Sequence, residues 1–233
     1  MTSTATNKTH ACAPPRYPAH LVALRRLPDG TNVIIRPIHP EDDAIERDFI
    51  NGLSRDTAYN RLLSGRKLTP DEIRHLTRID YDREMAFIAI TVARGQGRLL
   101  GVARYVRDAD DSGAEFAIVV ADAWQSKGVG SLLLRTLLQH AHSAGLARLH
   151  GITLATNQAM QDLARKLGFT QQPDPHDATV RQVTKTLAAG DQAAAARASA
   201  GYSAGAAAND EAMAPFNPRP PLASVSAGKE RAT

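Results

Sequence analysis

The chain has 233 residues, of which 43% are hydrophobic and 22% are charged, so it can bury one good core but hardly two. Its single cysteine, Cys12, excludes an intrachain disulfide and a cysteine metal cluster. The formal net charge is +4, but the lysines and arginines form no continuous stripe and aromatic residues are only 5%, which disfavours nucleic-acid binding. The first ten residues lack the apolar core of a signal peptide, and no apolar run approaches the roughly 18 residues that span a bilayer. We therefore expect a cytoplasmic protein without a membrane partner.

Composition divides the chain into three parts. Residues 1–20 are rich in Thr, Ala and Pro without apolar periodicity, and we expect them to be disordered. Residues 21–187 carry the periodic apolar pattern of one globular domain. From residue 188 to residue 233 the composition shifts to Ala, Gly, Ser and Pro with no apolar stripe, which predicts a disordered tail.

The first half of the domain is predicted to contain strands and helices in turn. Apolar runs at residues 21–24 and 33–35 flank a Pro-Asp-Gly turn signal, which indicates a hairpin. Pro40 and the acids after it favour a helix over residues 41–53, and a second helix is expected over residues 70–79. The segment between these two helices receives no predicted element.

Three strands are expected next, at residues 86–92, 99–107 and 115–120. A glycine-containing turn joins the first two. The third strand is almost continuously apolar, which predicts that both of its faces are buried.

The last third of the domain alternates helices and strands. A helix begins at residue 129, and its apolar stripe consists of Val129, Leu132, Leu133, Leu137 and Ala141. A strand is expected over residues 150–155, followed by a helix that Asn157 caps and Gly168 ends. A final strand is expected over residues 179–187.

The most informative segment lies between the strand at residues 115–120 and the following helix. A glycine-containing turn at a helix start points several backbone N–H groups at one spot, which suits a pyrophosphate. A dinucleotide-binding loop is excluded because its third glycine is replaced by Leu133. A P-loop is excluded because Lys127 precedes Gly128 instead of following a glycine.

The remaining pattern, Gln-x-x-Gly-x-Gly over residues 125–130, resembles the coenzyme A loop of the GNAT superfamily of N-acetyltransferases. The helix that begins at Asn157 and ends near Gly168-Phe169 also resembles this superfamily. The upstream segments look like the acetyltransferase domain of bacterial protein lysine acetyltransferases; they are Asp29-Gly30-Thr31, Ile35-Arg36-Pro37, Tyr59-Asn60-Arg61 and residues 79–85. The resemblance covers about residues 21–187. It implies an α/β fold with a central, mostly antiparallel mixed sheet and helices on both faces, and acetyl-CoA as co-substrate without a metal.

The resemblance also implies which residues bind acetyl-CoA. They are Val119, Val120, Gln125, Ser126, Lys127, Gly128, Val129, Gly130, Ser131 and Asn157. Several have an ordinary alternative: the two strand valines serve as core residues, Lys127 is an exposed lysine, and Asn157 is a helix N-cap. The histidines show no metal-ligand spacing with acids or cysteines, so no metal site is expected.

Transfer of an acetyl group to an amine requires the neutral amine. Deprotonating an ordinary lysine at pH 7 costs about 4.6 kcal/mol. The resemblance implies that Glu115 is the general base, directly or through water; the alternative is a solvated acid beside a turn. Many members of the superfamily carry a tyrosine as general acid seven residues after the asparagine, where this chain has Ala164. Tyr59 and Tyr81 are candidates for the general acid only because they carry the same phenol group.

These features predict an enzyme that moves an acetyl group from acetyl-CoA to a primary amine, with a protein lysine as the leading acceptor. A small amine, such as a polyamine or an amino acid, is the first alternative. A non-catalytic module that senses acetyl-CoA is the second. The acceptor and the oligomeric state stay open at this point.

Overall fold

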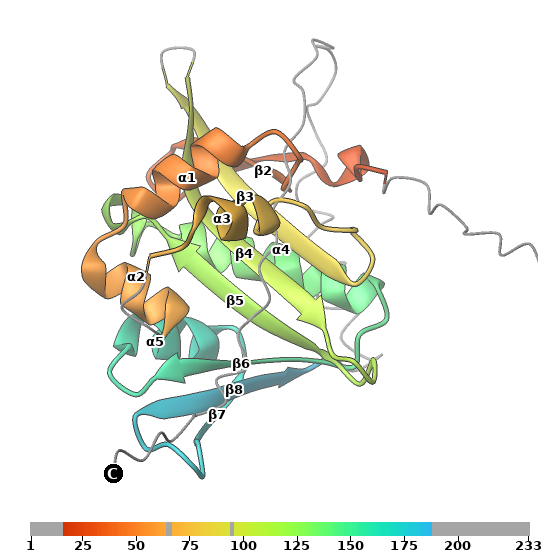
Figure 1. The fold of residues 1–233 in the computed structure, drawn as a ribbon, viewed down its shortest axis with the longest axis vertical. Coiled ribbons are helices and arrows are strands. Elements are labelled where there is room, and N and C mark those ends of the chain that lie inside the picture. Colours follow the sequence, from red (N-terminus) through yellow and green to blue (C-terminus); the bar gives the residue numbers. More distant parts are fainter. Residues whose placement is uncertain (1–15, 64–66, 94–95, 188–233) are drawn as a thin grey trace, which may run out of the picture.

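The computed structural model describes residues 16–63, 67–93 and 96–187, and Figure 1 shows their arrangement. The predictions for residues 1–15 and 188–233 lie outside this part of the chain. The helices and strands are, in chain order, η1 (Ala19–Leu21), β1 (Ala23–Arg26), β2 (Asn32–Pro37), α1 (Asp43–Asn51), α2 (Arg55–Leu62), α3 (Pro70–His75), β3 (Glu84–Ala93), β4 (Gln96–Arg107), β5 (Ala114–Val120), η2 (Asp122–Trp124), α4 (Val129–Ser143), β6 (Arg148–Leu154), α5 (Gln158–Lys166), β7 (Thr170–Pro173) and β8 (Val180–Thr186).

The strands form one sheet of eight in the order β1-β2-β3-β4-β5-β6-β8-β7. Every neighbouring pair is antiparallel except β5 and β6, which are parallel. The parallel pairing consists of Ala114 opposite Leu149 and Glu115 opposite His150. Beyond this point the two strands are not paired, and the sheet forks. The prediction of a mostly antiparallel mixed sheet is confirmed.

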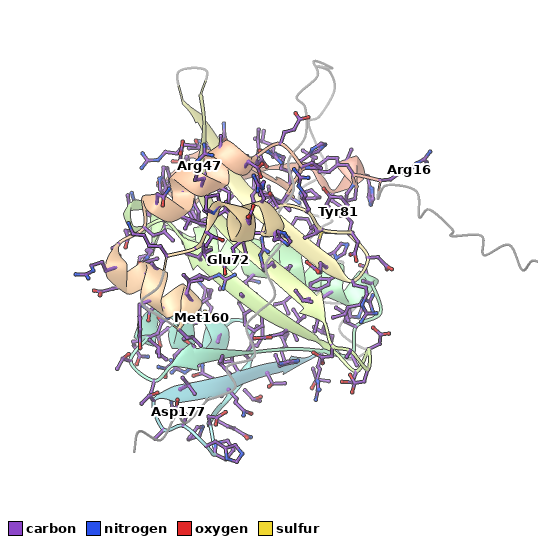
Figure 2. The ribbon with its side chains drawn as sticks, viewed as in Figure 1. Arg16, Arg47, Glu72, Tyr81, Met160 and Asp177 are labelled. Atoms are coloured by element: carbon purple, nitrogen blue, oxygen red, sulfur yellow. The ribbon has the colours of Figure 1, made fainter. Side chains whose placement is uncertain are left out.

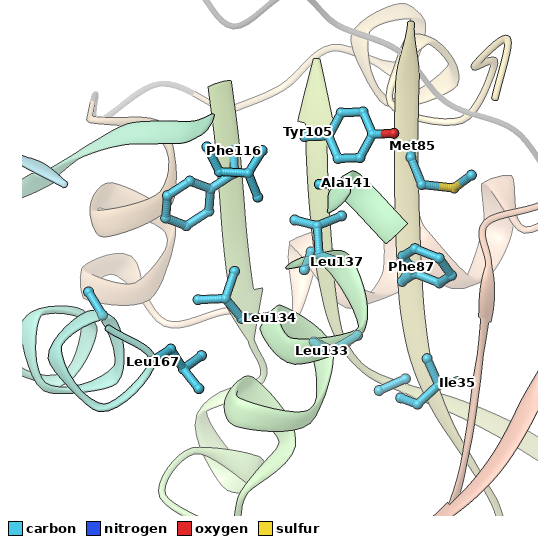
Figure 3. Close-up of a cluster of buried hydrophobic side chains, with 14 of the residues drawn as sticks. Ile35, Met85, Phe87, Tyr105, Phe116, Leu133, Leu134, Leu137, Ala141 and Leu167 are labelled. Atoms are coloured by element: carbon cyan, nitrogen blue, oxygen red, sulfur yellow. The ribbon is translucent and has the colours of Figure 1, made fainter. Parts of the chain in front are cut away.

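Helices cover both faces of the sheet, as predicted (Figure 1). On one face α4 buries Leu133, Leu134 and Leu137 completely, and they pack in the larger core cluster with Phe87 and Tyr105 (Figure 3). On the other face α1 contributes Phe49 to a second cluster that includes the buried strand residues Ile88 and Val102. The core therefore has two layers, with the sheet between them.

The structure adds helix α2, strand β7 and the short 3₁₀ helices η1 and η2 to the elements predicted from the sequence, and it corrects one expectation. Helix α2 lies in the segment that received no element, because its residues are polar and none of them is buried; its start is fixed by Ser54, whose Oγ accepts from the Thr57 amide at 3.2 Å. Strand β7 is short and mostly exposed. Strand β5 was expected to be buried on both faces, but residues 117–120 are only partly buried because they line a cleft at the fork.

Strands β4 and β5 approach each other closely at Gly101, where only a glycine fits. A Cβ atom on Gly101 would lie 2.7 Å from the Val119 carbonyl oxygen and 3.1 Å from Leu133 Cδ1. We predict that Gly101→Ala lowers the free energy of unfolding by about 1–3 kcal/mol, because backbone and core must both move. Gly97→Ala in the same strand is the matched control, since its Cβ would meet Ile90 at an ordinary 3.4 Å. Equal melting temperatures for the two variants would contradict this account.

Candidate active site

A cleft of about 680 Å³ lies at the fork between β5 and β6. Helix α2 borders one side, the start of α4 and helix α5 border the other, and Met160 of α5 lies in its wall (Figure 2). The predicted site residues that line it are Glu115, Val119, Val120, Gln125, Ser126, Gly128, Gly130, Ser131 and Asn157. The fold thus gathers into one cleft residues that are spread over more than forty positions of sequence.

Two of the predicted site residues do not line the cleft. The side chain of Val129 is fully buried in the larger core cluster. Lys127 is exposed, and its Nζ lies 5.0 Å from the centre of the Trp124 ring. A contact of Lys127 with a ligand stays a prediction.

The turn into α4 has the geometry of an anion cradle. Ser126 and Gly128 both adopt positive φ, at 59° and 93°, which turns the chain sharply into the helix. The Leu132 amide donates to the Gly128 carbonyl at 3.0 Å, so the amides of residues 129–131 precede this helical bond and lie at the positive end of the helix. Such an end favours a pyrophosphate.

A network of side chains ties this turn to α2. Asp122 accepts from the Ser54 amide at 3.0 Å, the Ser54 hydroxyl at 2.6 Å and the Thr57 hydroxyl at 2.7 Å. The side-chain amide of Gln125 donates to the Thr57 hydroxyl at 3.1 Å and to the Val120 backbone carbonyl at 3.2 Å. Sequence reasoning missed this network because the partners are up to 68 positions apart.

Strand β6 and helix α5 supply further polar groups to the cleft. The Asn157 side-chain oxygen caps α5 by accepting from the Met160 amide at 3.1 Å, so the capping role expected from the sequence is present in a residue that also lines the cleft. Thr153 also lines the cleft, and its buried hydroxyl has no hydrogen-bond partner among the described residues. A ligand with amide groups, as the pantetheine arm of coenzyme A has, fits this orphaned hydroxyl.

Glu115 lies at the narrow end of the fork, in the last pair that joins β5 to β6. Burial raises the pKa of its carboxyl group, while the charges of His150 and Arg61 act in the opposite direction. A carboxylate with a raised pKa holds a proton more firmly, which suits a general base near neutral pH.

The candidate general acids do not reach the cleft. Ala164 is fully buried in the core, so the position where many relatives carry tyrosine points away from solvent. The Tyr81 hydroxyl donates to the Ile38 carbonyl at 2.9 Å, and Tyr59 is exposed on α2. Among the described residues that line the cleft there is no tyrosine.

A group of buried charges adjoins the cleft on the α1 and α2 side. Arg61 and Arg104 line both the cleft and a small side cavity of about 30 Å³, and Glu46 closes the side cavity. Glu46 is 2% exposed, and its Oε2 finds no hydrogen-bond partner in the part of the chain that the structure describes. The cavity has room for a water molecule.

Burial raises the pKa of Glu46 to about 7 and lowers that of Arg104 to about 10. Sequence reasoning missed this group, because Glu46 lies among other polar residues of α1.

The described residues hold neither a metal-binding cluster nor a membrane-spanning helix. No three or more His, Cys, Asp or Glu side chains come together as a candidate metal site there. No helix in the same ranges has the length and apolar character needed to cross a membrane.

Comparison with known proteins identifies the class. Residues 32–170 match the family model of the acetyltransferase (GNAT) domain. The chain is 38% identical to the acetyltransferase PA5475 of Pseudomonas aeruginosa over 163 residues, which are 70% of this chain and 87% of that protein. The chain therefore belongs to the GNAT acetyltransferase family, and it is an acetyl-CoA-dependent acetyltransferase.

Two further relatives carry the name Pat. The chain is 33% identical to the acetyltransferase Pat of Mycolicibacterium smegmatis over 138 residues, which are 58% of this chain and 40% of that protein. The crystal structure of the GNAT domain of the S. lividans PAT superposes with a TM-score of 0.68 at 27% identity, covering 74% of this chain and all of that domain. The fold predicted from the sequence is confirmed by these matches.

The glycine at the start of α4 can be tested against a matched glycine at the end of the same helix. Gly128 and Gly145 have positive φ of 93° and 74°, so Ala strains the backbone at both, but only Gly128 lines the cleft. We predict that Gly128→Ala weakens acetyl-CoA binding by about tenfold or more, because the strained turn misaligns the helix-start amides. Gly145→Ala should bind normally in calorimetry. Equal affinities would remove the turn from the binding site.

The buried Glu46 predicts a specific pH dependence of stability. Its pKa is about 7 in the folded protein against an ordinary 4.5, so folding favours its protonated form. The stability it contributes is complete below pH 4.5 and is lost as the pH rises to about 7. Relative to Glu46→Gln, which cannot ionise, the wild type should lose on the order of 3 kcal/mol across this window in urea unfolding. The exposed Glu41→Gln is the control, and parallel curves for Glu46→Gln and the wild type would contradict the assignment.

Proposed function

We propose that the protein acetylates primary amines with Glu115 as general base, and that protein lysine side chains are its main acceptors. The observation that carries the proposal is the position of Glu115, a partly buried carboxylate in the same cleft as the helix-start amides of α4. The names of the Pat relatives and the match to a PAT domain support this acceptor class. A cytoplasmic location belongs to the same proposal.

In this proposal, the unpaired edge of β5 binds the acyl group of acetyl-CoA. Val119 and Val120 pair with β4 through Val102 and Gly101, and backbone groups along a strand point alternately to its two sides. Every second residue of β5 beyond Glu115 therefore turns its N–H and C=O groups toward the fork, where β6 is not paired with it. Backbone groups on that edge are available to bind the extended arm and the thioester carbonyl of acetyl-CoA. The turn of residues 125–131 would hold the pyrophosphate at the other end of the same cleft.

The chemistry then needs three contributions from the chain. Glu115 accepts a proton from the acceptor ammonium, directly or through water, and the free amine attacks the thioester carbonyl. The backbone of β5 stabilises the negative charge that develops on the carbonyl oxygen. The cleft holds the two reactants next to each other.

The acceptor class is tested by incubating the protein and acetyl-CoA with a lysate and mapping new acetyl-lysines, beside a panel of polyamines and amino acids. Site-selective protein acetylation that exceeds an enzyme-free control supports the proposal. Rapid turnover of a small amine without protein acetylation would replace it with the small-amine alternative. Binding of acetyl-CoA without any transfer would favour the sensor.

The base is tested by Glu115→Gln, which keeps the shape of the side chain but cannot take up a proton. We predict that turnover at neutral pH falls by about 10²–10⁴-fold while acetyl-CoA affinity changes little. The residual rate should climb with pH, because more of the amine is then deprotonated without help. Asp162→Asn, which changes another carboxylate of the cleft wall, is the control. Turnover of Glu115→Gln that equals the wild type would reject the base.

A further inference from the structure

Each turnover of the proposed reaction must export one proton. An ammonium and a thioester become an amide, a thiol and one free proton, so a base that has accepted the proton must lose it before the next cycle. Glu115 lies in the narrow end of the cleft and is partly shielded from solvent. The structure therefore has to offer a route from Glu115 to bulk water when the acceptor occupies the cleft.

His150 is the immediate neighbour of Glu115 across the sheet. The two residues are opposite each other in the parallel pair of β5 and β6, so their side chains project from the same face of neighbouring strands about 4.8 Å apart. They form the last pair before the strands separate. The charge of His150 is also the largest electrostatic influence that opposes the burial of Glu115.

His150 is in turn bound to the carboxylate of Asp108. Its Nε2 lies 2.8 Å from Asp108 Oδ1, and the side chains of the two residues are 33% and 20% exposed. A neutral His150 that donates from Nε2 to Asp108 keeps Nδ1 as its proton acceptor. Asp108 then stabilises the imidazolium that forms when Nδ1 takes up a proton.

Several elements place charged or polar groups around Glu115, His150 and Asp108. Arg148 of β6 lies 3.6 Å from the other oxygen of Asp108, and Ser112 donates to that oxygen at 3.4 Å. Arg61 of α2, which also lines the cleft, lowers the pKa of Glu115 through its charge. The β8 residue opposite His150 is Thr184, which carries no charge.

We propose that Glu115, His150 and Asp108 form a proton exit: after each acetyl transfer the proton passes from the Glu115 carboxyl to His150 Nδ1, directly or through one water, and from the imidazolium to solvent. This inference rests on the proposed role of Glu115 as base. His150 contacts no substrate atom in this scheme and is a relay residue, held in place and polarised by Asp108. The relay returns Glu115 to its carboxylate form without a path through the occupied cleft.

The relay is tested by His150→Ala, which removes the proton carrier and leaves a partly exposed space that imidazole can enter. We expect kcat near neutral pH to fall about ten- to a hundredfold and to recover as imidazole is added. His150→Gln, which can still bond to Asp108 but cannot carry a proton, should lose as much, and Asp108→Asn should lose less. His75→Gln, on the exposed surface of α3, is the control. Acetyl-CoA affinity and melting temperature report whether each variant is folded.

The outcomes separate this inference from the proposed function. A wild-type kcat in His150→Ala and His150→Gln, or a loss in His150→Ala that imidazole does not restore, would overturn the relay. Glu115→Gln, measured beside them, should keep only its low residual rate, and imidazole should not raise it. If Glu115→Gln turns over normally, the base itself is rejected; if it is impaired while the His150 variants are normal, only the relay is rejected.

Discussion

The fork between β5 and β6 is the constraint on which the rest of the site depends. In an unbroken sheet the facing backbone groups of the two strands would bind each other. Here the pairing ends at Glu115 and His150, so one edge of β5 lies along a cleft of about 680 Å³. The strands stay close near this point because residue 151 is glycine; a Cβ there would lie 2.9 Å from the Phe116 carbonyl oxygen. One feature of the sheet therefore supplies both a free backbone edge and a carboxylate at its end.

The walls of the cleft are joined by hydrogen bonds more than by packing. Helix α2 buries none of its residues, yet it carries Arg61 into the cleft. Its first turn is bound to Asp122 and Gln125, which belong to the turn that leads into α4. Helix α2 and the turn into α4 are consequently joined by direct side-chain hydrogen bonds.

Features that depend on local sequence could be predicted, and those that depend on distant partners could not. The turn at residues 125–131 and the cap at Asn157 are encoded within a few positions, and both are present in the structure. Helix α2 has no apolar stripe, so periodicity could not find it. The burial of Glu46 beside Arg104 arises only when α1 packs on β4, and nothing within either segment indicates it. The partial exposure of β5 was missed for the same reason, because a fork is a property of two strands.

Two opposing effects act on the partly buried carboxyl group of Glu115. Burial alone stabilises the protonated form of Glu115, and a carboxyl group that stayed protonated at neutral pH could not accept a proton from an amine. Arg61 and a protonated His150 shift its pKa in the opposite direction, toward the carboxylate form. Cations that overcame the effect of burial entirely would make the carboxylate too weak a base. In the proposed mechanism, a pKa that burial raises and neighbouring charges oppose suits a group that accepts a proton from the substrate and releases it again in each cycle.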